Sequence, residues 1–357
     1  MTQVLTHFYV SLNSFLMKIL IIRLSAMGDV ALTIPVVEAF SKIYANAEIF
    51  MLTNKLFNPF FSEINNLILI NPELKSKHKG FIGLFKLYKE IKKEYSIDVV
   101  IDLHDVLRSK VLRFFFTLSG VKTYKIEKGR VKKKLLVKQK RKVLKQLKHS
   151  TQRYKDVFED AGFYFNINKK TDQKKKQLPN KFRFSSLENV KKIGIAPFAM
   201  HKQKQYIYSK MLQVVELLNE REYEIFIFGG GNSEKQKASI IENNFENVTS
   251  LIGKFKLEEE IAIISNLDLM ITMDSSNMHI AALMGVKIVS IWGATHPYAG
   301  FTPFISDEKS FIIQNDNLSC RPCSVFGNKE CFKGTLECFE TIQVDEIIKT
   351  CESILRY

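Results

Sequence analysis

The segment LIIRLSAMGDVALTIP, Leu20–Pro35, joins an apolar run to a stretch with helical spacing. The run has the composition of a buried strand, and apolar residues recur near helical spacing over Val30–Tyr44. Between the two, Gly28 permits a tight turn and lets a ligand approach the backbone. Asp29 follows at the predicted start of the helix, where a carboxylate has two alternative roles. It either caps free backbone N–H groups or acts as a general base at the lip of a cleft.

Outward from this segment, apolar strands alternate with amphipathic helices. In the first half, the predicted strands are 18–24, 47–53, 67–70 and 98–103. A polar segment at 168–184 is the predicted linker. After it the alternation restarts, with predicted strands at 191–198, 224–231, 268–273 and 286–293. Continuous apolar strands separated by helices indicate parallel sheets covered on both faces. We therefore predict an α/β protein of two Rossmann-like domains, residues 17–180 and 181–357, that face each other across a cleft.

Composition narrows the class of protein. The chain has 357 residues, a hydrophobic fraction of 46% and a net charge of +16, which points to anionic partners. No run has the length of a membrane-spanning helix. Residues 1–16 lack a basic n-region and a cleavage site, so they are predicted to be a leader or a mis-assigned start rather than a signal peptide. We expect the chain to be cytoplasmic.

A second polar turn follows a strand in the C-terminal half. Asp274, Ser275, Ser276 and Asn277 lie between the apolar run at 268–273 and a predicted helix. Backbone N–H groups and hydroxyls at a helix N-terminus make a site for an anion such as a phosphate, and simple capping is the alternative. His279 is a secondary candidate there, with packing as its alternative role.

Two further loops follow strands of the same half. Lys204 lies in a loop from which a lysine can reach a diphosphate, although a solvated basic loop has the same composition. Gly229–Gly231 end a strand, and Glu234 follows at a distance from which an acid can bind a ribose hydroxyl. This last pattern lacks the full dinucleotide-binding spacing.

Residues 122–148 are rich in Lys and Arg and contain a single acid, Glu127. The segment fits a solvated face, or one that contacts an anionic membrane or an acidic substrate. A basic nucleic-acid-binding protein is a remote alternative, because aromatic residues are nearly absent from the segment and no recognition motif is present.

Five cysteines are too few for a disulfide framework in a chain of this length. Four of them cluster late in the sequence, at Cys320, Cys323, Cys331 and Cys338. Thiolates favour tetrahedral zinc sites, but the second half of the cluster lacks a C-x2-C pair. Structural zinc and reduced thiols in a loop both remain open.

Several of these motifs together resemble glycosyltransferase family 9, the lipopolysaccharide heptosyltransferases. The resemblance covers nearly the whole chain from Met17. Its motifs are RLSAMGDV at 23–30, DLHDVLRS at 102–109, APFA at 196–199, MDSSNMHIAAL at 273–283, WGATHP at 292–297 and the cysteine-rich segment. The motifs at 23–30 and 273–283 are specific in combination.

The resemblance implies a GT-B fold and a metal-independent, inverting transfer of a heptose from ADP-heptose to a lipopolysaccharide inner-core acceptor. No cofactor is expected. It implies that Asp29 is the catalytic base and that Arg108 and Arg130 bind an anionic acceptor in the N-terminal domain. The donor-binding residues that it implies in the C-terminal domain are Lys204, Glu234, Asp274, Ser275, Ser276, Asn277 and His279.

The sequence departs from the family pattern at two places in the donor pocket. Pro197–Met200 replaces a segment that often contains Thr or Ser, and Ser276 stands where the family often has Gly. A transferase that uses another nucleotide sugar, or a non-lipid glycan acceptor, is therefore the alternative function. With a lipid-linked acceptor, the enzyme is expected at the cytoplasmic face of the inner membrane, in peripheral contact with anionic lipid and without a nucleic-acid partner.

Overall fold

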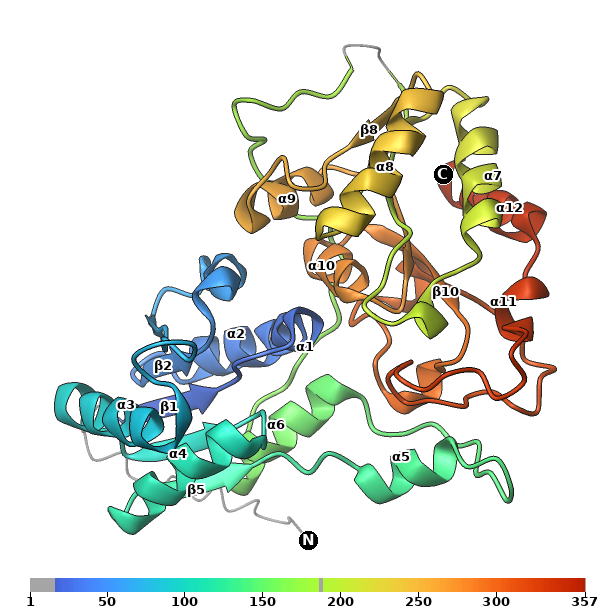
Figure 1. The fold of residues 1–357 in the computed structure, drawn as a ribbon. Helices are drawn as coiled ribbons and strands as arrows, with labels where there is room; N and C mark the ends of the chain where they lie inside the picture. The colour runs from blue at the N-terminus through green and yellow to red at the C-terminus, as the bar shows by residue number, and fades with distance from the viewer. Residues whose placement is uncertain (1–16, 186–188, 357) are drawn as a thin grey trace, which may run out of the picture.

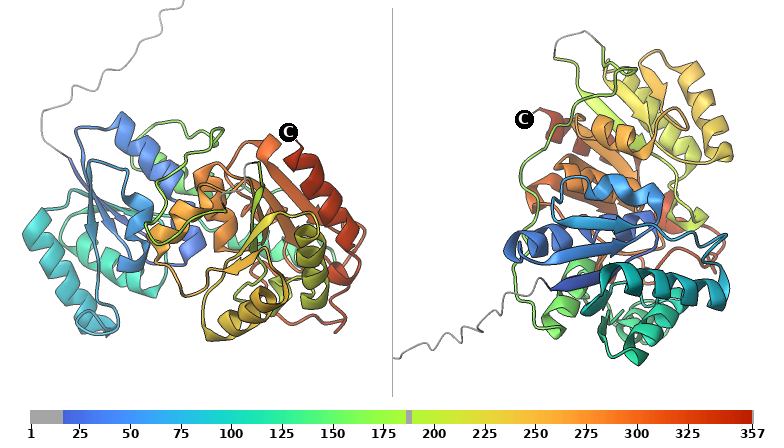
Figure 2. Two further views of the ribbon diagram at one scale, coloured as in Figure 1. Left: turned by 90° about the horizontal axis from the view of Figure 1, so that it is seen from above. Right: turned by 90° about the vertical axis from the view of Figure 1, so that its left-hand side faces the viewer.

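The computed structural model describes residues 17–185 and 189–356 (Figure 1). The predicted leader, 1–16, lies outside the described residues. Two parallel sheets with helices around them form the molecule, one in each half of the chain (Figure 2). No described helix combines the length and the apolar character that a membrane span requires.

The N-terminal sheet has five strands in the order β3-β2-β1-β4-β5, and its paired strands are all parallel. Its strands are β1 Lys18–Ile22, β2 Glu48–Leu52, β3 Leu67–Ile70, β4 Val99–Asp102 and β5 Lys122–Lys125. The helices of this half are α1 Met27–Ala31, α2 Ile34–Ile43, η1 Lys55–Phe61, α3 Gly80–Tyr95, α4 Leu107–Leu118, α5 Arg130–Leu136 and α6 Ser150–Asp160. The apolar strands β1 and β4 are buried at its centre, as continuous apolar runs predict.

The C-terminal sheet has six parallel strands in the order β11-β10-β9-β6-β7-β8. They are β6 Lys192–Ala196, β7 Glu224–Ile227, β8 Val248–Ser250, β9 Leu269–Met273, β10 Lys287–Trp292 and β11 Ser310–Gln314. Its helices are η2 Lys202–Lys204, α7 Tyr208–Asn219, α8 Asn232–Asn244, α9 Leu257–Ile264, α10 Ser276–Met284, η3 Pro297–Ala299, η4 Asp307–Lys309, α11 Glu337–Glu340 and α12 Val344–Leu355. The last helix, α12, packs on α7 and β10 and so belongs to the C-terminal half.

Each sheet reverses its strand order at one point. In the first sheet this switch point lies between β1 and β4, and in the second it lies between β6 and β9. Ligands of open parallel sheets bind outside the carboxyl ends of the strands at such points. The loops after these four strands therefore form the expected site.

The structure corrects one predicted helix and adds elements that the sequence did not predict. The helix expected at 30–44 is broken at Leu32–Thr33, because Pro35 lacks the N–H that would continue the helical hydrogen bonds and is instead accommodated in the first turn of α2. The basic segment 122–148 contains strand β5 and helix α5. Strands β8 and β11 were not predicted, and β8 is only 3 residues long.

The described residues of the segment that connects the two halves form no helix, and the halves share a buried core. Among the described residues between α6 and β6, the only strand-like pairing is an isolated bridge from Lys170 to Ile305. One apolar cluster includes Ile19 and Val30 of the first half and Met278 of the second. Helices α1 and α10 pack against each other at this junction.

Candidate active site

Asp29 lies in the first turn of α1 at the N-terminal switch point. Its Oδ2 atom is 2.6 Å from Nη2 of Arg23, and the Asp29 side chain is 34% exposed. The N-cap of α1 is Ala26, and no side chain caps this helix. The capping alternative for Asp29 is therefore wrong, and its carboxylate is held at the strand ends by a cation.

Arg23 is itself fixed by three elements. Its Nη1 atom donates to the backbone oxygen of Leu103 at 2.7 Å, and its guanidinium lies 5.6 Å from the ring centroid of Tyr154. The Tyr154 hydroxyl donates to the backbone oxygen of Asp29 at 3.5 Å, and burial raises the pKa of this phenol. Arg23 follows β1, Leu103 follows β4 and Tyr154 lies in α6. The position of the guanidinium, and with it the direction of the Asp29 carboxylate, is therefore set by contacts to three elements of the domain.

His104 follows β4 at the same edge of the sheet. Its Nδ1 atom accepts from the backbone N–H of Leu24 at 3.4 Å. Burial, ahead of the nearby Arg23 and Lys128 charges, lowers the pKa of His104 to about 3. The imidazole is therefore neutral near pH 7, with Nδ1 as an acceptor.

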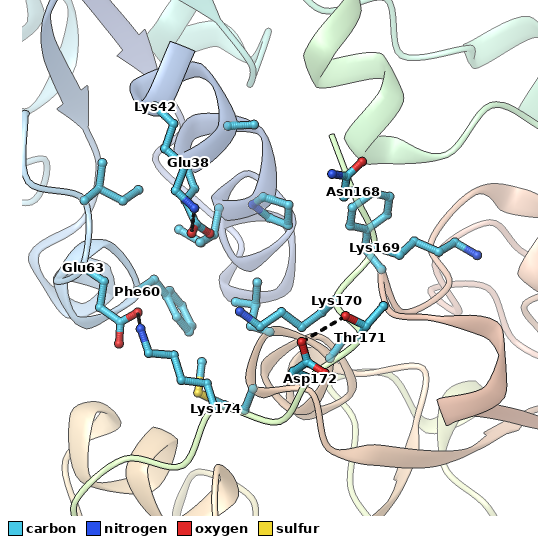
Figure 3. A pocket seen from close by; sticks show the side chains of 18 of the residues that line it. Glu38, Lys42, Phe60, Glu63, Asn168, Lys169, Lys170, Thr171, Asp172 and Lys174 are labelled. Carbon is cyan, nitrogen blue, oxygen red and sulfur yellow. Dashed lines mark hydrogen bonds and ion pairs between the residues drawn. The ribbon is translucent and has the colours of Figure 1, made fainter. Parts of the chain in front are cut away.

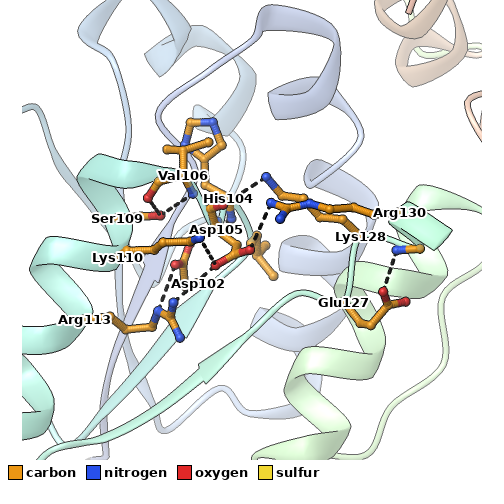
Figure 4. A network of polar contacts seen from close by, with 12 residues as sticks. Asp102, His104, Asp105, Val106, Ser109, Lys110, Arg113, Glu127, Lys128 and Arg130 are labelled. Atoms are coloured by element: carbon orange, nitrogen blue, oxygen red, sulfur yellow. Dashed lines mark hydrogen bonds and ion pairs between the residues drawn. The ribbon is translucent and has the colours of Figure 1, made fainter. Parts of the chain in front are cut away.

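A polar network around Asp102 organises the loop after β4 at this edge (Figure 4). The fully buried Asp102 accepts from the backbone N–H groups of His104 and Asp105, both at 2.9 Å, and its Oδ2 is 3.1 Å from Nε of Arg113. Asp105 in turn pairs with Arg130 at 3.5 Å. The buried carboxylate thus fixes the loop that precedes α4.

The two predicted acceptor-binding arginines differ in their surroundings. Arg130 begins α5, remains 67% exposed and is joined to the network through Asp105. Arg108 is an exposed residue in the first turn of α4. Lys128, which sequence reasoning missed, donates to the backbone oxygen of Asp105 at 3.1 Å. These cations form a positive rim beside His104.

The C-terminal switch point brings Lys204 and Asp274 together. Lys204 lies in η2 after β6, Asp274 directly follows β9, and their side chains form an ion pair of 2.9 Å. The carboxylate side chain is 7% exposed and the lysine side chain 17%. The two sequence-distant residues proposed for one donor site are therefore neighbours.

Helix α10 begins immediately beside this pair. Its N-cap is Ser275, whose hydroxyl is 3.1 Å from Oγ1 of Thr272, and no side chain caps its N-terminus. Ser276 and Asn277 form the first turn and are half-buried. Free backbone N–H groups at the start of this 9-residue helix, next to a lysine, favour an anion there.

Gly28 and His279 face each other where α1 packs on α10. A Cβ atom at position 28 would lie 2.9 Å from Cδ2 of His279 and 3.4 Å from Cα of Ser276. In this structure the glycine therefore makes room for the other half of the protein, rather than for a substrate as the sequence suggested. Burial lowers the pKa of His279 to about 4, while the nearby Asp274 and Asp29 carboxylates act in the opposite direction.

Glu234 lies apart from the Lys204–Asp274 pair, in the first turn of α8 after β7. Its Oε2 atom accepts from the backbone N–H of Gly230 at 2.7 Å. Strand β7 neighbours β6, so this acid is at the same edge of the C-terminal sheet. In this structure, the Glu234 carboxylate stabilises the turn at Gly229–Gly231 through this hydrogen bond.

The basic segment around α5 reaches across to the C-terminal half (Figure 1). Nζ of Lys133 lies 4.4 Å from the ring centroid of Phe301, and Nζ of Lys142 donates to the backbone oxygens of Ser319, Arg321 and Pro322 at 2.9, 2.8 and 3.1 Å. Part of the segment is therefore an interdomain strap, which none of the sequence alternatives anticipated.

Lys133 gives the strap a pH dependence. Burial, ahead of the nearby Arg153 charge, lowers the pKa of Lys133 from 10.5 to about 8. Between these values the unfolded chain binds more protons than the folded one, so the free energy of unfolding rises with pH. Urea unfolding at pH 7.5 and at pH 9.5 measures this increase in the free energy of unfolding, and we expect Lys133→Met to reduce it. The control Lys134→Met, which changes the exposed neighbour, should leave the increase at its wild-type size. A wild-type increase in Lys133→Met would contradict the lowered pKa of Lys133.

The clustered cysteines are not gathered as a metal site in this structure. No group of three or more His, Cys, Asp or Glu side chains in the described parts of the chain is placed to hold a metal ion. This arrangement favours the alternative of reduced thiols, which are free here. They are Cys320, Cys323, Cys331 and Cys338. The loop is held instead by buried Arg321, which donates to the backbone oxygens of Gly293 and Thr295 at 2.6 and 3.2 Å.

A cavity of about 450 Å³ lies between the two halves, away from the strand ends (Figure 3). Its wall includes Phe60 of the first half, Met284 of the second and the connecting residues 168–172. At its edge Glu63 accepts from Lys174 and Lys176 at 2.6 and 2.5 Å. The residues predicted for donor and acceptor lie elsewhere, so this cavity belongs to the connection between the domains.

The sequence of this chain matches the model of glycosyltransferase family 9 (heptosyltransferase) over residues 84–332. Lipooligosaccharide heptosyltransferase 2 of Campylobacter jejuni is 24% identical over 95% of this chain and 99% of that protein. The lipopolysaccharide core heptosyltransferase OpsX of Haemophilus influenzae is 24% identical over 78% of this chain and 79% of that protein.

Solved structures show the same architecture. A family 9 glycosyltransferase from Veillonella parvula has a TM-score of 0.72 at 19% identity, covering 95% of this chain and 97% of its own. The ADP-heptose lipopolysaccharide heptosyltransferase II of E. coli has a TM-score of 0.67 at 18% identity, covering 95% and 98%. The predicted GT-B fold is confirmed, and the chain belongs to glycosyltransferase family 9 (heptosyltransferase).

Proposed function

We propose that this glycosyltransferase transfers a heptose from ADP-heptose to a lipopolysaccharide inner-core acceptor, with inversion at the anomeric carbon. The observation that carries the proposal is the α1–α10 contact. It places the Asp29 carboxylate of one half close to His279 in the first turns of α10, next to Lys204 and Asp274. The names of the relatives support heptose as the sugar and lipopolysaccharide or lipooligosaccharide as the acceptor.

In this proposal the two domains divide the substrates. Residues 17–180 bind the acceptor, whose anionic groups lie against Arg108, Arg130 and Lys128. Residues 181–357 bind the donor, with its diphosphate at the start of α10 and at Lys204. Glu234 turns from the Gly230 N–H toward the ribose hydroxyls when the nucleotide is bound.

The chemical step is a single displacement. Asp29 accepts the proton of the acceptor hydroxyl as that oxygen attacks the anomeric carbon. The bond from this carbon to the diphosphate oxygen breaks, and ADP leaves on the opposite face of the sugar. Lys204 and the backbone N–H groups of α10 stabilise the charge that develops on the diphosphate, so the proposed step uses no metal. Asp274 holds Lys204 in place before the donor arrives.

The nucleotide is the part of the proposal that a binding experiment tests most directly. We expect ADP to raise the melting temperature more than GDP or UDP at equal concentration, because a ligand stabilises the folded state by mass action. Lys204→Met should weaken ADP binding about tenfold, since it removes one charged contact to the diphosphate. The matched control is Lys202→Met, which removes an exposed lysine from the same short helix.

Two outcomes would contradict these assignments. A preference for GDP or UDP would exclude ADP-heptose and favour another nucleotide sugar, which the unusual Pro197–Met200 and Ser276 already bring into question. Equal ADP affinities of Lys202→Met and Lys204→Met would remove Lys204 from the diphosphate site. We place the enzyme at the cytoplasmic face of the inner membrane, where lipid-linked core acceptors are accessible to it.

A further inference from the structure

Helices α3 and α4 expose an unusual number of large apolar side chains. Ile82 is 83% exposed, Leu107 78% and Leu118 70%. We call the full set the α3–α4 face; its members are Phe81, Ile82, Phe85, Leu107, Phe114 and Leu118. Exposed apolar side chains scattered singly need no explanation, but a contiguous set marks an interaction surface.

The members of this face are contiguous. Phe81 and Phe85 of α3 and Phe114 of α4 all contact the ring of Phe115, with centroid distances of 5.3, 4.9 and 5.6 Å. On α4, residues 107, 111, 114 and 118 recur at helical spacing and therefore share one side of the helix. The aromatic cluster joins this stripe to α3, so both helices contribute to one surface.

The face is remote from the other half of the molecule. Both Figure 1 and the left view of Figure 2 show α3 at the outer side of the N-terminal sheet, away from the C-terminal sheet. The C-terminal half therefore does not cover it. The strap around α5, which sequence reasoning offered for membrane contact, instead uses Lys133 and Lys142 to contact the C-terminal half.

Cations surround the apolar side chains. Lys86, Lys89 and Lys93 are exposed on α3, and Nζ of Lys89 lies 4.6 Å from the ring centroid of Phe85. The same helix carries two acids: Glu90, which is already paired with Lys77 and His78, each at 3.0 Å, and the exposed Glu94, against four lysines. The face therefore combines an apolar centre with a positive rim.

We propose that the α3–α4 face docks on the surface of a bilayer that contains anionic lipid. The apolar side chains enter the boundary between headgroups and acyl chains, and the lysines lie at the anionic headgroups. A water-soluble protein partner has no general need for a lysine rim around exposed phenylalanines, whereas an anionic bilayer matches both the charge and the apolar character.

Docking in this way presents the acceptor side of the site to the lipid. Leu107 and Arg108 begin α4 directly after the loop that Asp102 fixes, and Arg130 pairs with Asp105 in that loop. This step rests on the proposed function, because it uses a lipid-linked acceptor. An acceptor anchored in the same bilayer would reach the positive rim without leaving the membrane.

The test is co-sedimentation of the full chain with lipid vesicles that contain no acceptor. We expect binding to phosphatidylcholine vesicles that include phosphatidylglycerol, and much weaker binding to phosphatidylcholine alone. Lys86→Gln, Lys89→Gln and Lys93→Gln together should weaken partitioning about 100-fold, at roughly fivefold per lysine. A second triple variant, Ile82→Ser, Phe114→Ser and Leu118→Ser, is called the α3–α4 variant. It should weaken binding to the anionic vesicles at least about tenfold.

A matched control removes equally exposed apolar side chains elsewhere. Ile43, Tyr164 and Ile240 are 63%, 70% and 56% exposed, and changing all three to Ser should leave vesicle binding at the wild-type level. Equal loss in the control and in the α3–α4 variant would overturn the proposal, as would wild-type protein that stays in the supernatant with anionic vesicles. A dimer in sedimentation velocity that the α3–α4 variant abolishes would assign the face to a second copy and also overturn it.

A second measurement separates docking from the proposed function. Transfer to a soluble, deacylated core oligosaccharide should be unchanged in the α3–α4 variant, which shows that the variant folds and that its site is intact. Loss of that transfer would contradict a docking role for these side chains. If wild-type protein binds anionic vesicles but transfers no heptose, the proposed function fails and the docking surface stands.

Discussion

Asp29→Asn is expected to lower kcat about 1000-fold, the middle of the range for removing a general base. The variant keeps an oxygen that can accept from Arg23, so the melting temperature and ADP affinity should stay near those of the wild type. Initial rates with saturating donor, together with thermal unfolding of the same samples, measure both quantities.

Glu38→Gln is the matched control for Asp29→Asn. Glu38 is an exposed carboxylate on α2 that pairs with Lys42 on the same helix, so its neutralisation should leave kcat unchanged. Wild-type kcat in Asp29→Asn would remove Asp29 from the role of base. A large loss of stability would instead give the Arg23–Asp29 pair a structural role.

Arg113→Met is expected to lower the free energy of unfolding by about 3 kcal/mol. The substitution leaves the Asp102 carboxylate, which is fully buried, with two backbone N–H donors but without its cation. Breaking a buried ion pair from one side is strongly destabilising because the remaining charge stays out of water. Urea unfolding followed by circular dichroism measures the change.

Lys110→Met tests whether burial is the cause. Lys110 is an exposed cation on the same helix, and its nearest carboxylate oxygen, on Asp105, is 4.0 Å away. Its loss should cost less than about 1 kcal/mol, as for exposed ion pairs in general. If both variants unfold at the wild-type urea concentration, the Asp102 network does not determine the stability of this edge of the N-terminal sheet.

Sequence reasoning succeeded where strong local patterns decide the structure. The continuous apolar runs at β1, β4, β6 and β9 identified the centres of both sheets, because such strands must be buried on both faces. The same runs identified the loops that carry Asp29 and Asp274, since polar residues follow each strand directly. Whether these two residues perform the proposed roles stays a prediction.

Other features depend on contacts that a single sequence does not reveal. Arg23 was part of a recognised motif, but only the fold brings Leu103 and Tyr154 around it. A charged residue at the end of a buried apolar strand was the available signal. Lys133 stood in a run of lysines, and nothing local distinguishes the one that packs on Phe301 from its exposed neighbours. Such contacts join residues that are 80 or more positions apart.

The contact between Gly28 and His279 has a consequence for the proposed mechanism. Because a Cβ atom at position 28 would already lie 2.9 Å from the imidazole of His279, a larger residue there would push α1 and α10 apart. In the proposed mechanism, the spacing between Asp29 and the donor site at the start of α10 is then set by two helices that pack against each other. Any separation of these two helices also withdraws Asp29 from that donor site.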